Sequence, residues 1–482
     1  MTSGASTMRR VAVVGGGIAG LSAAYQLHHA GAAGMPIRFT LFEASPRLGG
    51  IIETTRRAGF TIEGGPDGWV SEKPWARELA AELGLADAIV GSLDAERVTY
   101  IATEGALTAM PKGMRMMVPG DLQAAMDSTL FTDAAKQAMA AEPARAEELR
   151  RSALARATDR LDESVRDFTV RHFGAEVADT VAAPLLAGVF GGDISHLSVR
   201  SVMPHFIALE QEHGSLILGL QRTVRSGGKH GSIFSSLREG LGSLVEHLAA
   251  RLPAPAMHCE APVTGLERTH AGWKLYRRGA DAEEFDGVIA ALPAPHAARL
   301  LARVDAGLPP LMPQTFSSAI VVALAFAPGA SLRIPPGFGF LVPQSGRSAD
   351  KGALLACTFL HQKYPHRAPE GGALLRAFFG GPSAASLLPE TDEALERLAV
   401  DSLAEFLGPI PPRQFTVVRR WPDSLPLYPV GHLERIDRLE ARVAQIPGLR
   451  ITGSLLRGVG LPDVIHQSRD AAQSLAQELS GA

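Results

Sequence analysis

The chain has 482 residues, which is too long for one ordinary core and indicates two or three domains. Hydrophobic residues make up 46% and charged residues 20%. The formal net charge of −3 argues against an overall positive potential that would attract nucleic acid. The two cysteines, Cys259 and Cys357, lie far apart without a CxxC partner. This spacing argues against a disulfide framework or a metal site and favours a reducing, cytoplasmic location.

The apolar N-terminal stretch is interrupted by glycines and is followed by no small-residue cleavage site, so we interpret it as strand, turn and helix and not as a signal peptide. No uninterrupted apolar run reaches the roughly 18 residues that a spanning helix needs. Peripheral contact with a membrane stays open.

The sequence RVAVVGGGIAGLSAAYQLHHAG, from Arg10, predicts a buried strand, a glycine turn and a helix. Gly15, Gly17 and Gly20 have GxGxxG spacing, which permits a tight turn, close approach to a pyrophosphate and close helix packing. A second strand, IRFTLFEA, ends in Glu43, about 20 residues after the turn, where a carboxylate is expected to hold a ribose hydroxyl.

The stretch ASPRLGG follows directly and supplies Arg47, which can neutralise phosphate, and Gly49 and Gly50, which permit close backbone approach. The whole pattern resembles the FAD-binding motif of the amine oxidase and phytoene desaturase superfamily. A plain structural turn is the alternative.

The middle of the chain predicts helices from about residue 111 to residue 209, and then several short apolar strands such as FSSAIVVALAFAP and ALLRAFFGG. These strands are typical of a sheet that covers a ligand-binding site. The stretch PKGMRMMVPGDL carries four methionines with Lys112 and Arg115. It has two interpretations, a membrane or hydrophobic-ligand surface and core-filling methionines.

Near the C-terminus, LRIT predicts a short strand, and Gly453, Gly458 and Gly460 permit close contact before Pro462 begins a helix. The superfamily resemblance implies that this segment returns to the dinucleotide domain and covers the flavin. It also implies that APVTGLERT contributes a strand in which the backbone of Val263 touches the adenine.

Four separated blocks make the resemblance more specific: GFGFLVPQ, CTFLHQKYPHRAPEGGALLRAFFGG, WPDSLPLYPVGHLERI and GSLLRGVGLPDVI. Together they resemble the oxygen-dependent, FAD-containing protoporphyrinogen oxidase family, including its bacterial branch that acts on coproporphyrinogen III. The family implies six-electron oxidation of a porphyrinogen in haem biosynthesis, with molecular oxygen as acceptor and hydrogen peroxide released. The flavin carries the chemistry, so no catalytic side chain and no metal are predicted.

The resemblance implies an α/β fold: a discontinuous Rossmann-like FAD-binding domain, a mixed-sheet substrate domain and a helical membrane-associated subdomain. We place the FAD domain at residues 1–90, 230–295 and 440–482, the substrate domain at 91–110 and 296–439, and the helical part at 111–229. A homodimer, handover to ferrochelatase and contact with the inner face of the cell membrane stay open.

The family pattern also implies site residues. Arg97 matches a propionate-binding arginine, Gly188 a glycine facing the ring nitrogens, and Phe338, Leu341 and Phe378 the macrocycle-sandwiching positions. An exposed arginine, a helix-ending glycine and ordinary sheet core are the structural alternatives. Flavin contacts are implied for Gly65, Asp67, Ser454, Val459 and Leu461.

Some positions stay undecided. Asp67 stands where some members carry an arginine, so a positive charge beside the flavin would have to come from Lys73 or be absent. Arg457 either holds a propionate or pairs with a carboxylate. His366 and His432 are more typical of polar loops than of catalytic bases.

Three other functions compete with this assignment. An amine oxidase is disfavoured because residues 454–458 lack the cysteine that tethers the flavin in many members. A carotenoid desaturase would give Arg97 nothing to bind. A flavin or porphyrin carrier without turnover stays open.

Overall fold

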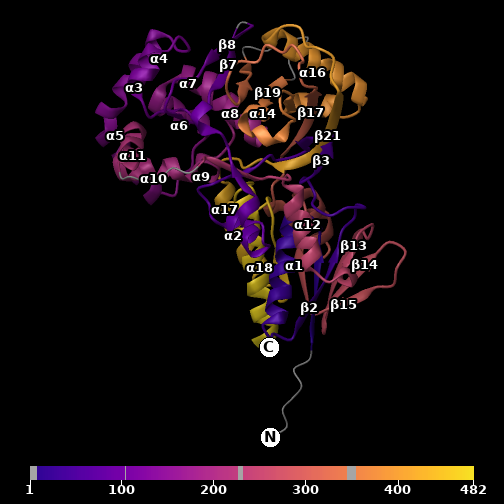
Figure 1. Ribbon diagram of the computed structural model, residues 1–482. Helices are drawn as coiled ribbons and strands as arrows, with labels where there is room; N and C mark the ends of the chain where they lie inside the picture. The colour runs from indigo at the N-terminus through magenta and orange to yellow at the C-terminus, as the bar shows by residue number, and fades with distance from the viewer. Residues whose placement is uncertain (1–7, 104, 226–231, 345–353, 482) are drawn as a thin grey trace.

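The computed structural model describes residues 8–103, 105–225, 232–344 and 354–481. Figure 1 shows two levels. A narrow lower lobe holds β1 and α18, the first and last described elements, and a wider upper part divides into a helical region on the left and a sheet domain on the right. The boundary predicted between residues 229 and 230 lies outside the described residues.

A five-stranded parallel sheet forms the lower lobe, in the order β12 (Met257–His258), β2 (Ile37–Phe42), β1 (Arg9–Val14), β16 (Gly287–Ala290) and β22 (Leu449–Ile451). Its central strands are apolar on both faces because both faces are covered. The strands come from three distant stretches of the chain, which confirms the α/β class.

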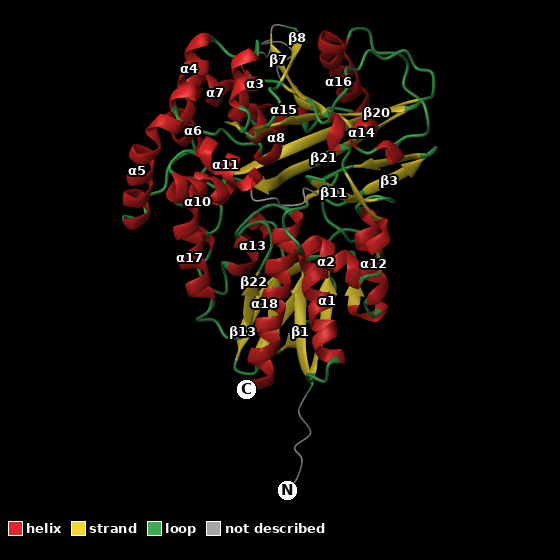
Figure 2. Cartoon of the chain, turned by 60° about the vertical axis from the view of Figure 1, so that its left-hand side comes forward, coloured by secondary structure: helices red, strands yellow, loops and turns green. Residues whose placement is uncertain are grey.

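Helices cover one face of this sheet: α1 (Ile18–Ala32), α2 (Trp75–Glu82), α12 (Gly242–Arg251) and α18 (Leu461–Gly481). Figure 2 shows α1, α2 and α18 in front of the strands. The other face packs against a small sheet of β13 (Val263–Thr269), β14 (Gly272–Arg277) and β15 (Glu283–Phe285), and against α13 (Ala294–Leu301) and α17 (His432–Val443). The lobe therefore has three layers around two apolar cores.

A seven-stranded mixed sheet forms the right side of the upper part. Its order is β21 (Phe415–Pro426), β17 (Phe316–Phe326), β20 (Ala373–Gly380), β19 (Leu354–Phe359), β18 (Gly339–Leu341), β7 (Thr99–Thr103) and β8 (Ala106–Ala109). One face packs on α16 (Asp392–Leu407) through buried side chains that include Phe340, Phe359 and Phe379. The other face is turned toward the dinucleotide lobe, where α14 (Leu360–Lys363) and the hairpin of β3 (Thr54–Arg57) and β4 (Phe60–Glu63) lie.

The helical region has its own apolar core. Its helices are α3 (Leu122–Asp127), α4 (Asp133–Ala141), α5 (Ala146–Thr158), α6 (Val165–Phe173), α7 (Ala175–Val177), α8 (Ala183–Phe190), α9 (Val199–Val202), α10 (Pro204–His213) and α11 (Leu216–Arg225). Side chains of Asp121, Thr132, Ser164 and Ser198 cap four of them.

The methionine-rich stretch belongs to this helical core. Met114 and Met117 are buried, and Met110 and Met116 pack against the same cluster. The core-filling interpretation of these methionines is therefore the one that the structure supports. Within the described ranges, no helix combines the length and the apolar character that crossing a membrane requires.

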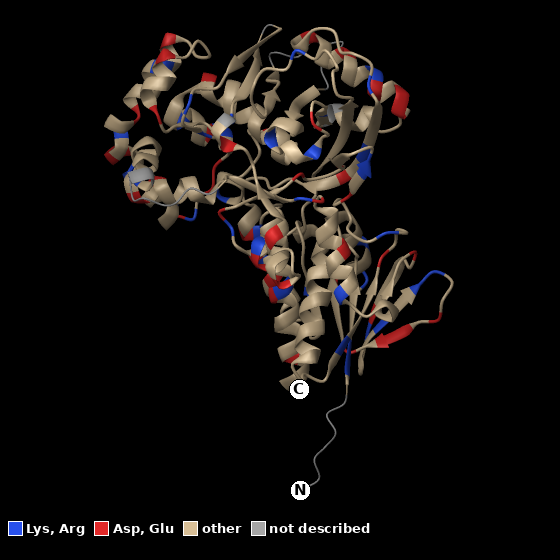
Figure 3. Cartoon of the chain, in the orientation of Figure 1, with Lys and Arg blue, Asp and Glu red and all other residues tan. Residues whose placement is uncertain are grey.

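The remaining elements join these parts. A three-stranded sheet of β5 (Trp69–Val70), β11 (Phe234–Leu237) and β6 (Ile89–Gly91) lies between the dinucleotide lobe and the upper part. A short hairpin of β9 (Met114–Arg115) and β10 (Val118–Pro119) opens the helical region, and α15 (Pro382–Leu387) follows β20. In Figure 3 basic and acidic residues are interspersed over the helices and around β13 to β15.

Candidate cofactor and substrate site

The glycine turn lies at the carboxyl end of β1, where a parallel sheet binds nucleotides. A Cβ on Gly20 would lie 1.8 Å from the carbonyl oxygen of Gly15, so the helix can pack this closely only with glycine there. Helix α1 begins after Gly17 without a side-chain cap. Its first amide groups are therefore available to an anion.

Glu43 follows β2 at the edge of this turn. Its carboxylate accepts hydrogen bonds from the amides of Gly16 at 2.6 Å and Ser45 at 2.8 Å. The amide of Ala261 donates to the Glu43 carbonyl at 2.8 Å, which places the segment leading into Val263 beside the same edge. The structure thus brings Glu43 and the Val263 strand together.

The second glycine pair lies against the first turn. Gly17 and Gly49 form a bridge, and a Cβ on Gly50 would lie 3.3 Å from the Gly17 Cα. Arg47 donates to the Gly50 carbonyl at 2.6 Å and pairs with Glu53 at 3.1 Å. In the structure Arg47 therefore supports the glycine loop, and its role toward a phosphate stays a prediction.

The C-terminal segment returns to the same place. Gly453 follows β22 and faces Ala19 of α1, since a Cβ added to Gly453 would lie 3.7 Å from the Ala19 methyl group. Ser454 accepts a hydrogen bond from the Tyr428 hydroxyl through its carbonyl, and α18 begins at Leu461. Val459 packs against the core of the helical region. The segment thus links the glycine turn with the upper part.

Two undecided cations are neutralised by carboxylates. Arg457 lies 2.7 Å from carboxylate oxygens of both Asp437 and Glu440, so the structure shows the ion-pair alternative. Lys73 lies 2.6 Å from Asp463 in the first turn of α18. Neither cation is left unpaired beside the glycine turn.

His432 is buried and supports the C-terminal loop. Its Nε2 lies 2.7 Å from the carbonyl oxygen of Leu456, and its ring stacks on Tyr428 with 4.1 Å between centroids. Burial lowers the pKa of His432 to about 4, although the hydrogen bond to Leu456 opposes this shift. The residue is therefore neutral at ordinary pH and holds the loop.

This lowered pKa gives a pH-dependent stability. Between pH about 6.5, the ordinary histidine value, and about 4, the unfolded chain binds more protons than the folded one, so stability falls as the pH falls. The effect approaches about 3 kcal/mol. His432→Gln is expected to flatten this slope in melting temperatures recorded between about pH 7.5 and about pH 4.5. Equal slopes for the two proteins would contradict the assignment.

Gly17, Gly49 and Gly50 lie against one another, and together with Gly65 we call them the glycine floor. The loop from Glu63 to Gly68 contributes Gly65 to it. A Cβ on Gly65 would lie 2.0 Å from the carbonyl oxygen of Ile51, the residue after Gly50. Asp67 in this loop lies 3.0 Å from Lys363 of α14 and 3.5 Å from Arg376 of β20. Sequence reasoning missed both cations, although an arginine inside the apolar run ALLRAFF was a signal for a buried partner.

These charges decide the ionisation of Asp67. Burial would raise the pKa of Asp67, but Lys363 and Arg376 outweigh it and lower that pKa below its ordinary value. Arg376 also donates to the Gly65 carbonyl, and the Trp421 indole donates to the Gly64 carbonyl at 2.7 Å. The substrate-side sheet therefore holds the loop in place.

Two of the predicted substrate residues, Leu341 and Phe378, share one face of the seven-stranded sheet. Leu341 pairs with Ala356, and Ala356 pairs with Phe378, so their side chains point to the same side. Arg376 lies two residues before Phe378 and is on that side too, with its guanidinium carbon 4.9 Å from the Phe378 ring centroid. This face is therefore the one turned toward Asp67.

Gly188, in the helical region, lies opposite Leu341 of this face. It lies within α8, and a Cβ there would be 4.0 Å from a methyl carbon of Leu341. Gly188 is thus an exposed mid-helix position and not the helix-ending glycine, which is Gly191. Phe338 is buried, and its amide donates to the carbonyl of Val98 at 2.8 Å.

That bond places Phe338 beside the strand that follows Arg97. Arg97 is exposed, and no other described residue hydrogen-bonds or ion-pairs with its side chain. The geometry therefore offers an apolar face that adjoins the loop of Asp67. Arg97, directly before Val98, is a cation whose side chain has no partner among the described residues.

Comparison with known proteins shows the family of the chain. The family model for flavin containing amine oxidoreductase matches residues 18–476. The chain belongs to this family. A coproporphyrinogen III oxidase of Bacillus subtilis (strain 168) is 33% identical over 471 residues, covering 96% of this chain and 97% of that protein.

Two further relatives span equally much of the chain. A protoporphyrinogen oxidase of Bos taurus is 30% identical over 502 residues, covering 96% of this chain and 98% of that protein. A crystal structure from Exiguobacterium sp. 255-15, assigned to protoporphyrinogen oxidase, is 32% identical with a TM-score of 0.84 and covers 98% and 99% of the two chains. Cyclohexylamine oxidase from Brevibacterium oxydans, at 17% identity and a TM-score of 0.67, shares the fold.

The family member described here is an oxidoreductase whose cofactor is FAD. Its residues fit that group: the uncapped start of α1 suits a pyrophosphate, Glu43 suits a ribose, and the paired glycines leave space that any Cβ would fill. In the described part of the chain, no cluster of histidine, cysteine and carboxylate side chains has the arrangement of a metal site.

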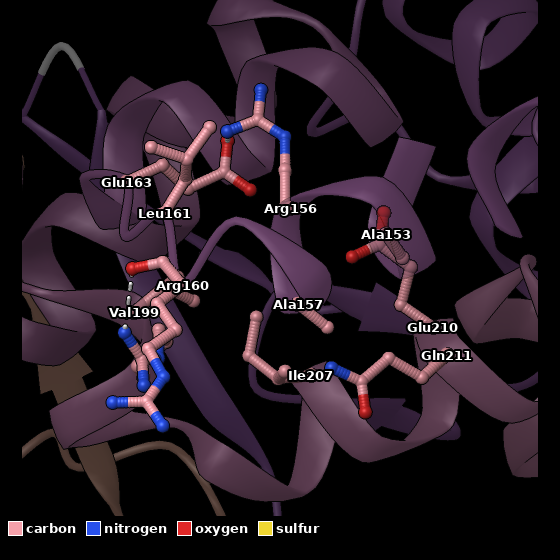
Figure 4. Close-up of a pocket in the computed structure, with 11 residues that line it drawn as sticks. Ala153, Arg156, Ala157, Arg160, Leu161, Glu163, Val199, Ile207, Glu210 and Gln211 are labelled. Carbon is pink, nitrogen blue, oxygen red and sulfur yellow. Dashed lines mark hydrogen bonds and ion pairs between the residues drawn. The ribbon is translucent and has the colours of Figure 1, made fainter. Parts of the chain in front are cut away.

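A separate cavity of about 130 Å³ lies in the helical region, among α5, α9 and α10. Figure 4 shows Arg156 close to Glu163 in its wall, with Glu210 on the opposite side. Arg171 pairs with both carboxylates, and His172 lies 3.2 Å from Glu210. These charges pair with one another within the helical region. Helices α5 and α10, which line the cavity, lie away from α1 in Figure 1.

Proposed function

We propose that this protein is an FAD- and oxygen-dependent porphyrinogen oxidase of haem biosynthesis. It would convert coproporphyrinogen III to coproporphyrin III or protoporphyrinogen IX to protoporphyrin IX. The observation that carries the proposal is the continuity of the site: the apolar face of Leu341 and Phe378 passes through Arg376 to the loop at Asp67 and the glycine floor. Relatives named for both reactions match nearly the whole chain.

The side chains of this site bind and orient the substrate. Leu341, Phe338 and Phe378 offer apolar walls to a flat macrocycle, and the missing side chain at Gly188 leaves room for its centre. Arg97, whose side chain has no partner in the described part of the chain, offers a cation to a propionate. FAD, when bound, would supply two-electron oxidation, with molecular oxygen as the final acceptor and hydrogen peroxide as its product. Over six electrons the porphyrinogen also loses six protons, and three molecules of oxygen take up the same number, so electrons and protons balance.

The flavin-binding roles are part of the same proposal. We assign the pyrophosphate to Gly15, Gly17 and Gly20, the ribose to Glu43, the adenine to the backbone of Val263 and the flavin ring to Gly65, Ser454, Val459 and Leu461. The three-part division of the chain, a homodimer and handover to ferrochelatase are included as predictions. Peripheral membrane contact would use exposed apolar side chains such as Leu154 and Leu161, because the methionines are buried.

Porphyrin fluorescence tests this function. The purified yellow protein is given coproporphyrinogen III and protoporphyrinogen IX separately in air, with autoxidation blanks. Fluorescence above the blank, with peroxide released, is the expected result, and the ratio of the two rates identifies the substrate. A protein that holds FAD but oxidises neither porphyrinogen would contradict the proposal and favour a desaturase or a carrier.

Arg97→Ala is expected to raise the Michaelis constant about tenfold and to change turnover much less, because a charge-assisted bond to a propionate acts equally in the ground and transition states. Steady-state kinetics with the preferred porphyrinogen measures both constants. Arg97→Lys keeps the charge and is expected to recover part of the affinity. An unchanged Michaelis constant in Arg97→Ala would remove Arg97 from the site.

A further inference from the structure

Charged side chains are concentrated in the seam between the dinucleotide lobe and the seven-stranded sheet. Lys363 Nζ lies 3.0 and 3.1 Å from the two carboxylate oxygens of Asp67, and Arg376 lies 3.5 Å from one of them. The side chains of Lys363, Asp67 and Arg376 are 11%, 17% and 1% exposed. This is a desolvated cluster and not a surface ion pair.

The cluster has more positive than negative charge. The neighbouring pair of Glu63 and Arg367, 3.1 Å apart, is fully buried and balanced. Lys363 and Arg376 then share the single carboxylate of Asp67, which leaves one positive charge in excess among these five side chains. The Nε of Arg376 is buried and has no hydrogen-bond partner in the described part of the chain.

The excess charge lies at the end of the glycine floor. Gly50 lies against Gly17, Ile51 lies against Gly65, and Arg376 donates to the carbonyl of Gly65. A dinucleotide that starts at the α1 N-terminus and follows this floor reaches the loop of Asp67 with its far end. Lys73 does not contribute comparable charge because Asp463 neutralises it.

We propose that Lys363 and Arg376, offset by Asp67, act as positioning residues that place a net positive charge beside the flavin and favour its reduced, anionic form. The inference deepens the proposed function and rests on the flavin site assigned there. Asp67 stays ionised between the two cations, so it reduces their net charge and fixes the positions of their side chains. Lys363 and Arg376 belong to the substrate-side elements α14 and β20, whereas Asp67 belongs to the loop beside the glycine floor. Residues of both domains would therefore set the reduction potential of the flavin.

Sulfite titration of the bound oxidised flavin measures this charge directly, since the sulfite adduct is anionic and bleaches the yellow absorbance. Lys363→Met is expected to raise the sulfite dissociation constant about tenfold, and Asp67→Asn is expected to lower it about tenfold. The double variant Asp67→Asn/Lys363→Met keeps the net charge and is expected to lie near the unchanged protein. For a two-electron couple, tenfold corresponds to about 30 mV in midpoint potential.

Arg413→Gln is the matched control, because Arg413 pairs with Glu396 of α16, away from the seam. Lys363→Arg keeps the charge and is expected to restore the sulfite affinity. Shifts of Asp67→Asn and Lys363→Met in the same direction, or shifts no larger than that of Arg413→Gln, would overturn the proposal. If Lys363→Met does not retain FAD, the sign of the Asp67→Asn shift decides.

The titration needs bound flavin but no porphyrinogen. A protein that oxidises neither porphyrinogen still reports the two opposite shifts, so the cluster can be confirmed while the proposed function is rejected. Normal porphyrinogen oxidation without opposite shifts would contradict the cluster alone.

Discussion

Gly20→Ala is expected to yield protein that is purified without FAD and unfolds at a lower temperature. The added Cβ would lie 1.8 Å from the carbonyl oxygen and 2.9 Å from the carbonyl carbon of Gly15, and neither backbone atom can move without opening the turn. Forcing α1 away from β1 is expected to cost about 3 kcal/mol or more. The flavin content of the purified protein and its melting temperature measure the two effects.

Gly17→Ala separates cofactor binding from folding. A Cβ at Gly17 would meet no protein atom closer than the Gly50 Cα at 3.9 Å, so the apoprotein is expected to melt as before. FAD affinity is nevertheless expected to fall at least about tenfold, because the backbone can no longer approach the pyrophosphate closely. Gly481→Ala, with open space around its Cβ, is the control for both. Full flavin content in Gly17→Ala would show that the pyrophosphate does not lie at this turn.

Local signals predicted the dinucleotide lobe well. The turn of Gly15, Gly17 and Gly20 lies within one strand, turn and helix, and its spacing alone fixes how the three residues meet. The C-terminal return was predicted by resemblance, and the contact of Gly453 with Ala19 shows the two ends meeting. Pattern and packing agree here because the motif lies within adjacent elements whose apolar residues are buried against the sheet.

Long-range charge pairs escaped prediction for a physical reason. Asp67 and Lys363 are 296 positions apart, and no periodicity connects them. The sequence drew attention to Lys73, which is close to Asp67 along the chain, but the fold pairs Lys73 with Asp463. Only the approach of α14 and β20 to the loop of Asp67 shows which cations compensate that carboxylate.

The methionine stretch shows a different limit. Soft apolar side chains with flanking cations are compatible with a membrane surface and with a core, because composition does not tell which way they point. The short hairpin of β9 and β10 turns Met114 inward and leaves Arg115 exposed. Tertiary packing, and not the pattern, decided between the two interpretations.

Arg367→Met is expected to destabilise the protein by about 3 to 5 kcal/mol, since it leaves Glu63 charged and buried without its partner. Glu63 and Arg367 are both fully buried and 3.1 Å apart. The Glu63 carboxylate also accepts the Leu241 amide at 2.8 Å and the Thr54 hydroxyl at 2.6 Å, so it cannot turn to solvent. Thermal unfolding of the FAD-loaded protein measures the loss.

The double variant Glu63→Gln/Arg367→Met tests whether the charge itself causes this loss. Removing both charges abolishes the unpaired carboxylate, so the double variant is expected to be more stable than Arg367→Met alone. The side-chain amide oxygen introduced by Glu63→Gln would still be able to accept from Leu241, whereas the hydrogen bond from Arg367 to Ser236 is lost in both variants. Arg442→Met, which breaks an exposed pair with Asp305, is expected to change stability by less than about 1 kcal/mol. A double variant that is no more stable than Arg367→Met would contradict this explanation. The loss of stability would then come from the packing of the long arginine side chain and not from the unpaired charge of Glu63.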